Sequence, residues 1–163
     1  MVGARSRAGQ LSGQRLCSAR SLSEGEVMNV SEAMSDSVLT VGPGHSLREV
    51  ASLMAERRIG SAVVLDPEHP GPGIITERDI LMSLGAGESP DEEMVEAHMA
   101  SDVVFAAPDW SLDEAAEVMI KHGFRHLAVI RGSELAGMLS MRDLVRCYVE
   151  DAAAVAASAT SGN

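Results

Sequence analysis

The sequence predicts an α+β fold made of two copies of one β-α-β-β-α unit. Three observations carry this prediction: an internal repeat with a spacing of about 65 residues, a capped amphipathic helix in each copy, and two short apolar runs after each helix. At 163 residues, the chain can hold two half-sized units that share a core, but not two ordinary domains.

The repeat is seen when the two halves of the chain are aligned. Six pairs are 65 positions apart: Met34 and Met99, Pro43 and Pro108, Ser46 and Ser111, Glu49 and Glu114, Ala51 and Ala116, Met54 and Met119. Further on, Gly73, Thr76, Arg78 and Asp79 match Gly137, Ser140, Arg142 and Asp143 at a spacing of 64. One residue has therefore been lost from a connecting loop, where two copies of one unit tolerate a change best.

Each copy contains a first helix with a clear start. Ser46 and Ser111 are each followed three residues later by Glu, which is the capping-box pattern. Apolar residues then recur at helical spacing: Leu47, Val50, Ala51 and Met54, and Leu112, Ala115, Ala116 and Met119. Gly60 and Gly123 lie just beyond the predicted helix ends, where glycine is common.

The other elements follow the same order in both copies. We expect strands over 38–41, 62–65 and 73–75, and over 103–106, 127–130 and 135–139. Second helices are expected over 77–84 and from 141 to about 150, and a short acidic helix over 91–99. The predicted organisation is a disordered basic tail (1–26), repeat 1 (27–90), repeat 2 (91–150) and an Ala/Ser-rich tail (151–163).

Charge and composition limit the possible partners. Residues 1–26 contain four arginines and two glutamates, which gives them a net charge of +2. The whole chain has a net charge of −11, so residues 27–163 have a net charge of −13. An acidic body repels phosphate backbones and anionic lipid, so we expect neither nucleic acid nor membrane as a partner. Only Cys17 and Cys147 are present, and no apolar run approaches a membrane span, which favours a reducing cytoplasm.

The residues with the clearest chemistry follow the third strand of each copy. Thr76, Arg78 and Asp79 have Ser140, Arg142 and Asp143 as their counterparts, at a point where a buried strand runs directly into a helix. A carboxylate accepts hydrogen bonds from both hydroxyls of a vicinal diol, and arginine suits phosphate. Thr or Ser followed by Asp three residues later is also an ordinary helix cap, but two copies in register, each with Arg, favour a binding role.

These paired segments, with the helix starts and the stretches 58–64 and 124–129, resemble the CBS-domain family, whose tandem pairs are called Bateman modules. The resemblance covers residues 27–149. It implies two repeats related by a pseudo-twofold axis, with their sheets packed together and helices outside. It also implies two clefts that take AMP, ADP, ATP or S-adenosylmethionine as a regulatory ligand, with no required cofactor.

The resemblance also assigns roles to individual residues. Asp79 and Asp143 would bind ribose, Thr76 and Ser140 would assist them, and Arg78 and Arg142 would lie near phosphate. Adenine would lie near four apolar residues: Val41 and Ile59 in one cleft, Phe105 and Phe124 in the other. Arg125 and His126 would be further phosphate ligands, whereas Gly60 and Ser61 occupy the matching positions of repeat 1. We therefore expect unequal clefts, and the sequence leaves open which cleft receives Arg125 and His126.

No enzyme signature is present, so we expect no catalytic centre. We also expect no metal site, because Gly123 separates His122 from His126 and removes the meaning of their helical spacing. The favoured function is a ligand sensor that acts in trans on a protein effector and forms a homodimer. The alternative is a structural homodimerisation module with degenerate clefts.

Overall fold

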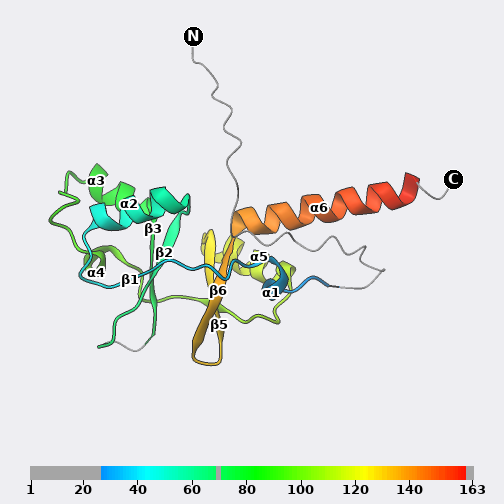
Figure 1. Ribbon diagram of the computed structural model, residues 1–163, viewed down its shortest axis with the longest axis horizontal. Helices are drawn as coiled ribbons and strands as arrows, with labels where there is room; N and C mark the ends of the chain where they lie inside the picture. Colours follow the sequence, from blue (N-terminus) through cyan, green and yellow to red (C-terminus); the bar gives the residue numbers. More distant parts are fainter. Residues whose placement is uncertain (1–26, 69–70, 161–163) are drawn as a thin grey trace, which may run out of the picture.

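The computed structural model describes residues 27–68 and 71–160 and confirms the predicted α+β fold (Figure 1). The predicted tail 1–26 lies outside the described residues. The elements, in chain order, are α1 (Val30–Ala33), β1 (Thr40–Val41), α2 (Leu47–Arg57), β2 (Ser61–Val64), β3 (Gly73–Thr76), α3 (Glu77–Gly85), α4 (Val95–His98), β4 (Phe105–Ala106), α5 (Leu112–His122), β5 (His126–Arg131), β6 (Glu134–Ser140) and α6 (Met141–Thr160).

The two repeats form two three-stranded sheets of the same topology. In each, the first strand runs parallel to the second, which is antiparallel to the third: β1-β2-β3 and β4-β5-β6. The first strands are shorter than predicted, at two residues each. Val38 and Val103, which we expected to begin these strands, pack against the cluster between the sheets instead.

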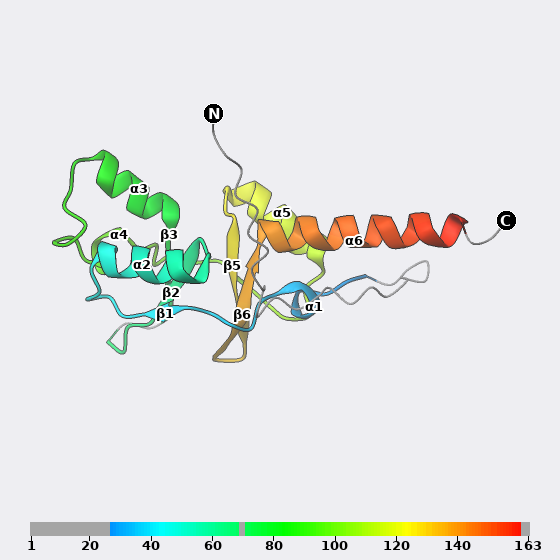
Figure 2. The ribbon, with the colours of Figure 1, turned by 45° about the horizontal axis from the view of Figure 1, so that its top comes forward.

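The sheets lie face to face, with the helices on the outer sides (Figure 2). Alternate residues of β2 point to opposite sides: Ala62 and Val64 join the core beneath the helices, while Val63 joins the cluster between the sheets. That central cluster consists of Val63, Ile74, Ala128 and Met138. Because the central strands are buried on both faces, their sequences are continuous apolar runs rather than alternating ones.

The short helices α1 and α4 are exchanged between the repeats. Val30 of α1 belongs to the core of repeat 2, and its amide donates to the carbonyl of Trp110 (2.8 Å). Val95 of α4 belongs to the core of repeat 1, and its amide donates to the carbonyl of His45 (2.9 Å). The short first helix of each repeat thus completes the core of the other repeat.

Two glycines allow the exchanged segments to cross the sheets. A Cβ atom at Gly73 would stand 3.1 Å from the carbonyl oxygen of Ala100, and one at Gly137 would stand 2.7 Å from that of Ser35. These crossings are held by backbone hydrogen bonds between Ile74 and Ala100 and between Met138 and Ser35. The glycines match in the two repeats because both crossings need the same close approach.

Three boundaries differ from the sequence predictions. Helix α6 continues to Thr160, so the tail predicted from residue 151 is helical over most of its length, and it projects away from the sheets (Figure 1). Only Val95–His98 of the expected acidic helix 91–99 is helical. The left-handed residue that ends α2 is Arg58 (φ 56°), not Gly60, whereas Gly123 (φ 71°) ends α5 as expected.

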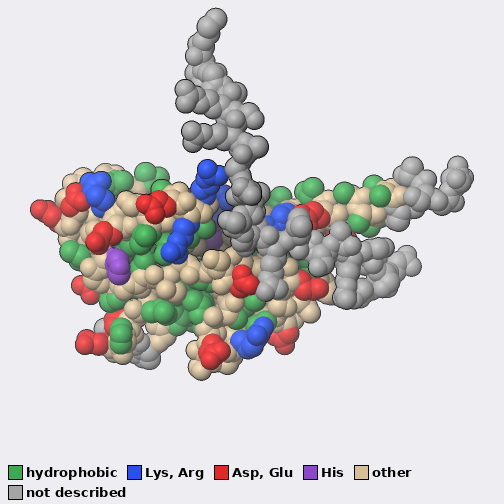
Figure 3. Space-filling model, in the orientation of Figure 1, with side chains coloured by type: hydrophobic (Ala, Val, Ile, Leu, Met, Phe, Trp, Pro, Cys, Tyr) green, Lys and Arg blue, Asp and Glu red, His purple; other side chains and the backbone are tan. Residues whose placement is uncertain are grey.

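No helix among the described residues is long and apolar enough to cross a membrane. Acidic side chains are spread over both halves of the face shown in Figure 3 rather than gathered in one patch. This distribution agrees with the net charge of −11 for the whole chain.

Candidate functional site

The strand-to-helix junction of repeat 1 places a carboxylate beside a hydroxyl. Thr76 ends β3 and is the N-cap of α3, and Asp79 lies in the first helical turn. Oδ2 of Asp79 accepts hydrogen bonds from the backbone amide of Thr76 (2.7 Å) and from its hydroxyl (2.6 Å). This capping box fixes the carboxylate, and its other oxygen, Oδ1, is not used in the cap.

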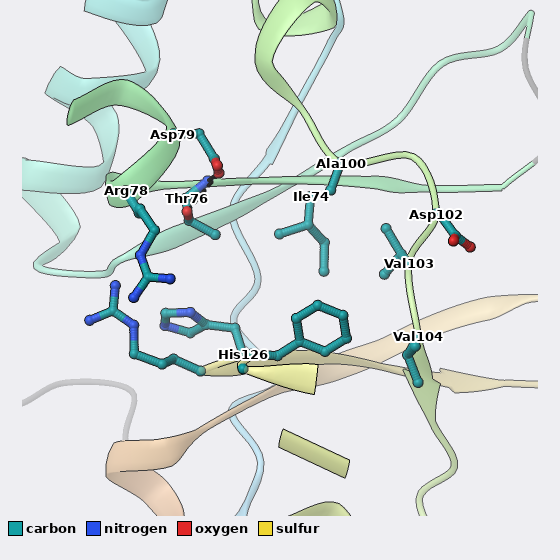
Figure 4. A pocket seen from close by; sticks show the side chains of 12 residues that line it. Ile74, Thr76, Arg78, Asp79, Ala100, Asp102, Val103, Val104 and His126 are labelled. Atoms are coloured by element: carbon teal, nitrogen blue, oxygen red, sulfur yellow. Dashed lines mark hydrogen bonds between the residues drawn. The ribbon is translucent and has the colours of Figure 1, made fainter. Parts of the chain in front are cut away.

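A pocket of about 190 Å³ lies in front of this junction (Figure 4). Three segments from different parts of the sequence line it. They are the junction itself (Ile74, Thr76, Arg78, Asp79), the linker before β4 (Ala100, Asp102, Val103, Val104), and the segment between α5 and β5 (Gly123, Phe124, Arg125, His126). The pocket is therefore shared between the two repeats.

Polar and apolar lining groups are separated in the pocket. Figure 4 shows Thr76, Arg78 and Asp79 toward one end, with His126 below them. Val103 and Val104 lie toward the other end, where the carboxylate of Asp102 is the one polar side chain labelled beside them. Such an arrangement suits a ligand with a flat apolar part joined to a polar, anionic part.

Arg125 is held at the pocket by a residue of the other repeat. Its guanidinium lies 3.4 Å from a carboxylate oxygen of Glu77, and both side chains are about half exposed. Gly60 makes room for this pair, because a Cβ atom there would stand 3.1 Å from the Glu77 carboxylate. An exposed ion pair of this kind is worth at most about 1 kcal/mol. Arg125 can therefore exchange Glu77 for a ligand phosphate at little cost.

His126 lies beside these charges and is partly buried. Burial lowers the pKa of His126, and the nearby Arg125 lowers it further. The neutral imidazole is therefore the main form near pH 7 in the free protein. A phosphate placed against His126 would oppose this shift and favour the protonated form.

Six of the twelve residues predicted to bind the ligand line this pocket: Thr76, Arg78, Asp79, Phe124, Arg125 and His126. Arg125 and His126, whose cleft the sequence left open, line the pocket of Asp79. His126 also pairs with Ser140 across β5 and β6, and the charge of Asp143 acts on it. Ser140, Arg142 and Asp143 form the corresponding junction at the start of α6, where Oδ2 of Asp143 accepts from the amide of Ser140 (2.9 Å).

The four apolar residues predicted to lie near adenine, which include Phe124, do not all lie at this pocket. Of these, only Phe124 lines the pocket, and its ring stacks on His122 with the centroids 5.4 Å apart. Val41 is buried in the core of repeat 1, and Ile59 packs against that core. Phe105 packs between the sheets. Only 5% of the surface of Val41 is exposed, and its position beside adenine stays a prediction.

Sequence reasoning missed the linker residues, Ala100 to Val104, that form the far wall of the pocket. They carry no motif, and only the crossing of this linker over β3 brings them to Thr76 and Asp79. The matching glycines at 73 and 137 were the available signal, because an invariant small residue in both copies marks a close backbone approach.

His98 also has neighbours that sequence reasoning did not connect with it. Its Nε2 lies 2.9 Å from a carboxylate oxygen of Glu93 and 3.8 Å from one of Glu88. The backbone around Glu93 is in turn bonded to α2, since the amide of Leu47 donates to the Glu93 carbonyl (2.9 Å). These contacts fix the loop between α3 and α4 against repeat 1.

Comparison with known proteins agrees with this architecture. The CBS domain family model matches residues 30–86 and 94–150. An uncharacterized 17.7 kDa protein from Acidianus ambivalens is 36% identical over 122 residues, which cover 74% of this chain and 73% of that protein.

Two solved structures are similar over most of the chain. A hexameric CBS-CP12 protein from bloom-forming cyanobacteria has a TM-score of 0.70 and 27% identity, covering 74% of this chain and 72% of its own. A CBS domain protein from Pyrobaculum aerophilum, complexed with AMP, has a TM-score of 0.67 and 29% identity, covering 77% and 99%. With both repeats matched by the family model and the fold shared with these structures, the chain belongs to the CBS-domain family and contains two CBS domains in tandem.

Proposed function

We propose that this CBS pair is a regulatory module that binds an adenosyl ligand in the cleft shared by its repeats and signals its occupancy to a separate protein. The observation that carries the proposal is the pocket in which Thr76 and Asp79 of repeat 1 meet Phe124, Arg125 and His126 of repeat 2. AMP, ADP, ATP and S-adenosylmethionine are the candidate ligands, and the relative from Pyrobaculum aerophilum that is complexed with AMP supports this class.

The proposed roles follow from the chemistry of the lining groups. Asp79 accepts from the two ribose hydroxyls, because its carboxylate is acceptor-only and its Oδ1 is outside the cap. Arg78, Arg125 and His126 face the phosphate or, in S-adenosylmethionine, the carboxylate. Phe124 lies with the apolar linker residues against the adenine ring.

A ligand shared by two repeats can act as a signal because it ties their relative placement to occupancy. The two repeats account for nearly all of the described residues. We propose that the output acts in trans, through a protein that distinguishes the occupied from the empty pair.

Thermal unfolding with the four candidate ligands tests this proposal. A ligand at about 100 times its dissociation constant stabilises the native protein by about 2.7 kcal/mol, which for this chain length raises the Tm by about 5–10 °C. Asp79→Asn should abolish the rise, while the matched variant Asp109→Asn, at an exposed turn residue, should retain it. No rise with any of the four ligands at millimolar concentration would contradict the proposal.

A structural homodimerisation module is the second candidate. Large apolar side chains are exposed on three helices: Leu81 and Met82 on α3, Ile120 on α5, and Val145 and Val149 on α6. These faces suit a second copy of the chain, and the cyanobacterial relative is hexameric. Sedimentation should show a dimer at micromolar concentration, and a 17.1 kDa monomer alone would contradict self-association.

A further inference from the structure

The two strand-to-helix junctions share their caps but differ one turn later. Thr76 and Asp79 have Ser140 and Asp143 as counterparts, and both pairs make the same capping box. Three residues after the aspartate, repeat 1 has Met82, which is 67% exposed. Repeat 2 has an arginine, Arg146, whose side chain is only 22% exposed. Residues three apart on a helix are neighbours, so this position decides what faces the aspartate.

Arg146 occupies the carboxylate oxygen that the cap leaves unused. Its Nη2 lies 3.2 Å from Oδ1 of Asp143, whose side chain is 14% exposed. The same Nη2 donates to the carbonyl oxygen of Ala33 at the end of α1 (3.3 Å). Both oxygens of Asp143 are thus engaged within the protein. By contrast, no described cation lies within ion-pair distance of Asp79.

Breaking the Arg146 contacts is costly because they are shielded from water. A pair that is largely withdrawn from solvent gains more from its partner than an exposed pair does, and removing the partner leaves a charge uncompensated. A ribose hydroxyl is neutral and cannot replace the guanidinium at Asp143. Displacing Arg146 would also release its hold on α1, which completes the core of repeat 2.

The second cleft also has fewer groups for an anion. Arg125 and His126 line the pocket of Asp79. The internal symmetry puts Gly60 and Ser61 at the matching positions toward Asp143, and neither carries a positive charge.

We infer that Arg146 closes the second cleft, so that each chain holds one adenosyl ligand, at Asp79. This inference rests on the proposed function and extends it. Arg146 and Met82 are then the residues that determine which of the two clefts is open. The Asp143–Arg146 pair serves to anchor α1 rather than to bind ligand.

A reciprocal exchange of the two residues tests the inference. AMP, ADP, ATP and S-adenosylmethionine are each titrated calorimetrically into four proteins: the wild type, Met82→Arg, Arg146→Met and the double exchange. The wild type should bind one ligand per chain. Met82→Arg should weaken binding at least tenfold, because the new guanidinium pairs with Oδ1 of Asp79. Arg146→Met should raise the stoichiometry to two, and the double exchange should bind one ligand, at Asp143.

The outcomes separate this inference from the proposed function. Failure of all four ligands to bind the wild type contradicts the proposed function. Two ligands per wild-type chain, or unchanged affinity in Met82→Arg, leaves the proposed function intact and overturns the inference. Met82 is exposed, so its substitution should not impair folding. Should Arg146→Met fail to fold, Arg146→Gln keeps a donor for the Ala33 carbonyl while removing the charge, and it should also raise the stoichiometry.

Discussion

The two repeats share one backbone and differ in the side chains that surround their clefts. Gly73 and Gly137, and the two capping boxes, are duplicated because both copies need the same crossing and the same helix start. The residues facing the clefts are under no such backbone requirement and have diverged. Arg125 stands where repeat 1 has Gly60, and Arg146 where it has Met82. The comparison teaches that a duplicated scaffold can keep its backbone while the side chains around its two clefts diverge.

The largest expected effect is a loss of stability on substitution at the two crossings, Gly73 and Gly137, and this loss should differ between them. Gly137→Ala puts a Cβ atom 2.7 Å from the Ser35 carbonyl oxygen and 2.7 Å from the sulfur of Met34. Gly73→Ala meets the Ala100 carbonyl at 3.1 Å and the sulfur of Met99 at 2.9 Å. Overpacking of this kind costs about 1–3 kcal/mol, and backbone yields less readily than a methionine side chain.

We therefore expect Gly137→Ala to lose more stability than Gly73→Ala, by about 1 kcal/mol, in urea unfolding of the ligand-free protein. Gly44→Ala is a suitable control, because nothing lies within 4 Å of its Cβ position. Equal losses at Gly73 and Gly137 would show that the backbone shifts to relieve both contacts.

An intermediate effect is expected on AMP binding when Arg125 is replaced, and it tests the difference between the two clefts. Arg125→Ala removes a guanidinium from the pocket of Asp79 and should weaken the binding of AMP about tenfold, by the loss of one charge-assisted contact. Adenosine, which has no phosphate, should bind both proteins equally well. Titration calorimetry with the two ligands gives the comparison.

Arg142→Ala, at the matching junction of repeat 2, provides the control for Arg125→Ala. Arg142 is exposed and does not line the pocket, so its loss should leave AMP affinity within about twofold. An equal loss of affinity in both variants would contradict the assignment of the ligand to the Asp79 cleft.

The smallest expected effect concerns pH and His126. Its pKa is lowered in the folded protein by burial and by Arg125, while Glu77 and Asp143 oppose this and Arg142 adds to it. As the pH falls below about 6.5, His126 is therefore protonated in the unfolded chain before it is protonated in the folded protein. The stability that comes from the neutral His126 is present above that pH and is lost below it. His126→Gln should remove the loss, seen as a smaller fall in Tm of the ligand-free protein between pH 7.5 and 5.5.

The exposed His45 serves as the control position for that pH series. His45→Gln should leave the pH dependence of the Tm as in the wild type, because His45 lies at an exposed position away from the pocket. A wild-type pH dependence in His126→Gln would mean that other groups account for the acid loss of stability.

Most of the secondary structure could be predicted from local signals. The serine caps of α2 and α5 are present as expected, with Ser46 and Ser111 accepting from the amides of Glu49 and Glu114. Gly60 lies beyond the end of α2 as expected, but the left-handed residue at that end is Arg58, which carries no sequence signal for this conformation. The extension of α6 was underestimated, since an alanine-rich sequence has high helix propensity but no periodic signal to mark where the helix ends.

About half of the candidate site could be predicted as well. Thr76 and Asp79 were identified because their capping pattern is local and duplicated. Asp102, Val103 and Val104 were missed because they reach the pocket only through a crossing between repeats.

The sequence by itself determined the duplicated unit, its capped helices, its apolar strands and the pair of polar junctions, because each depends on residues a few positions apart. Only the tertiary structure decided which repeat each short helix completes, which cleft receives Arg125 and His126, and that Arg146 also holds the end of α1 at Ala33. These choices depend on contacts between segments distant in the sequence. A local sequence pattern does not identify the distant segment that it contacts, so these contacts are determined by the packing of the two sheets.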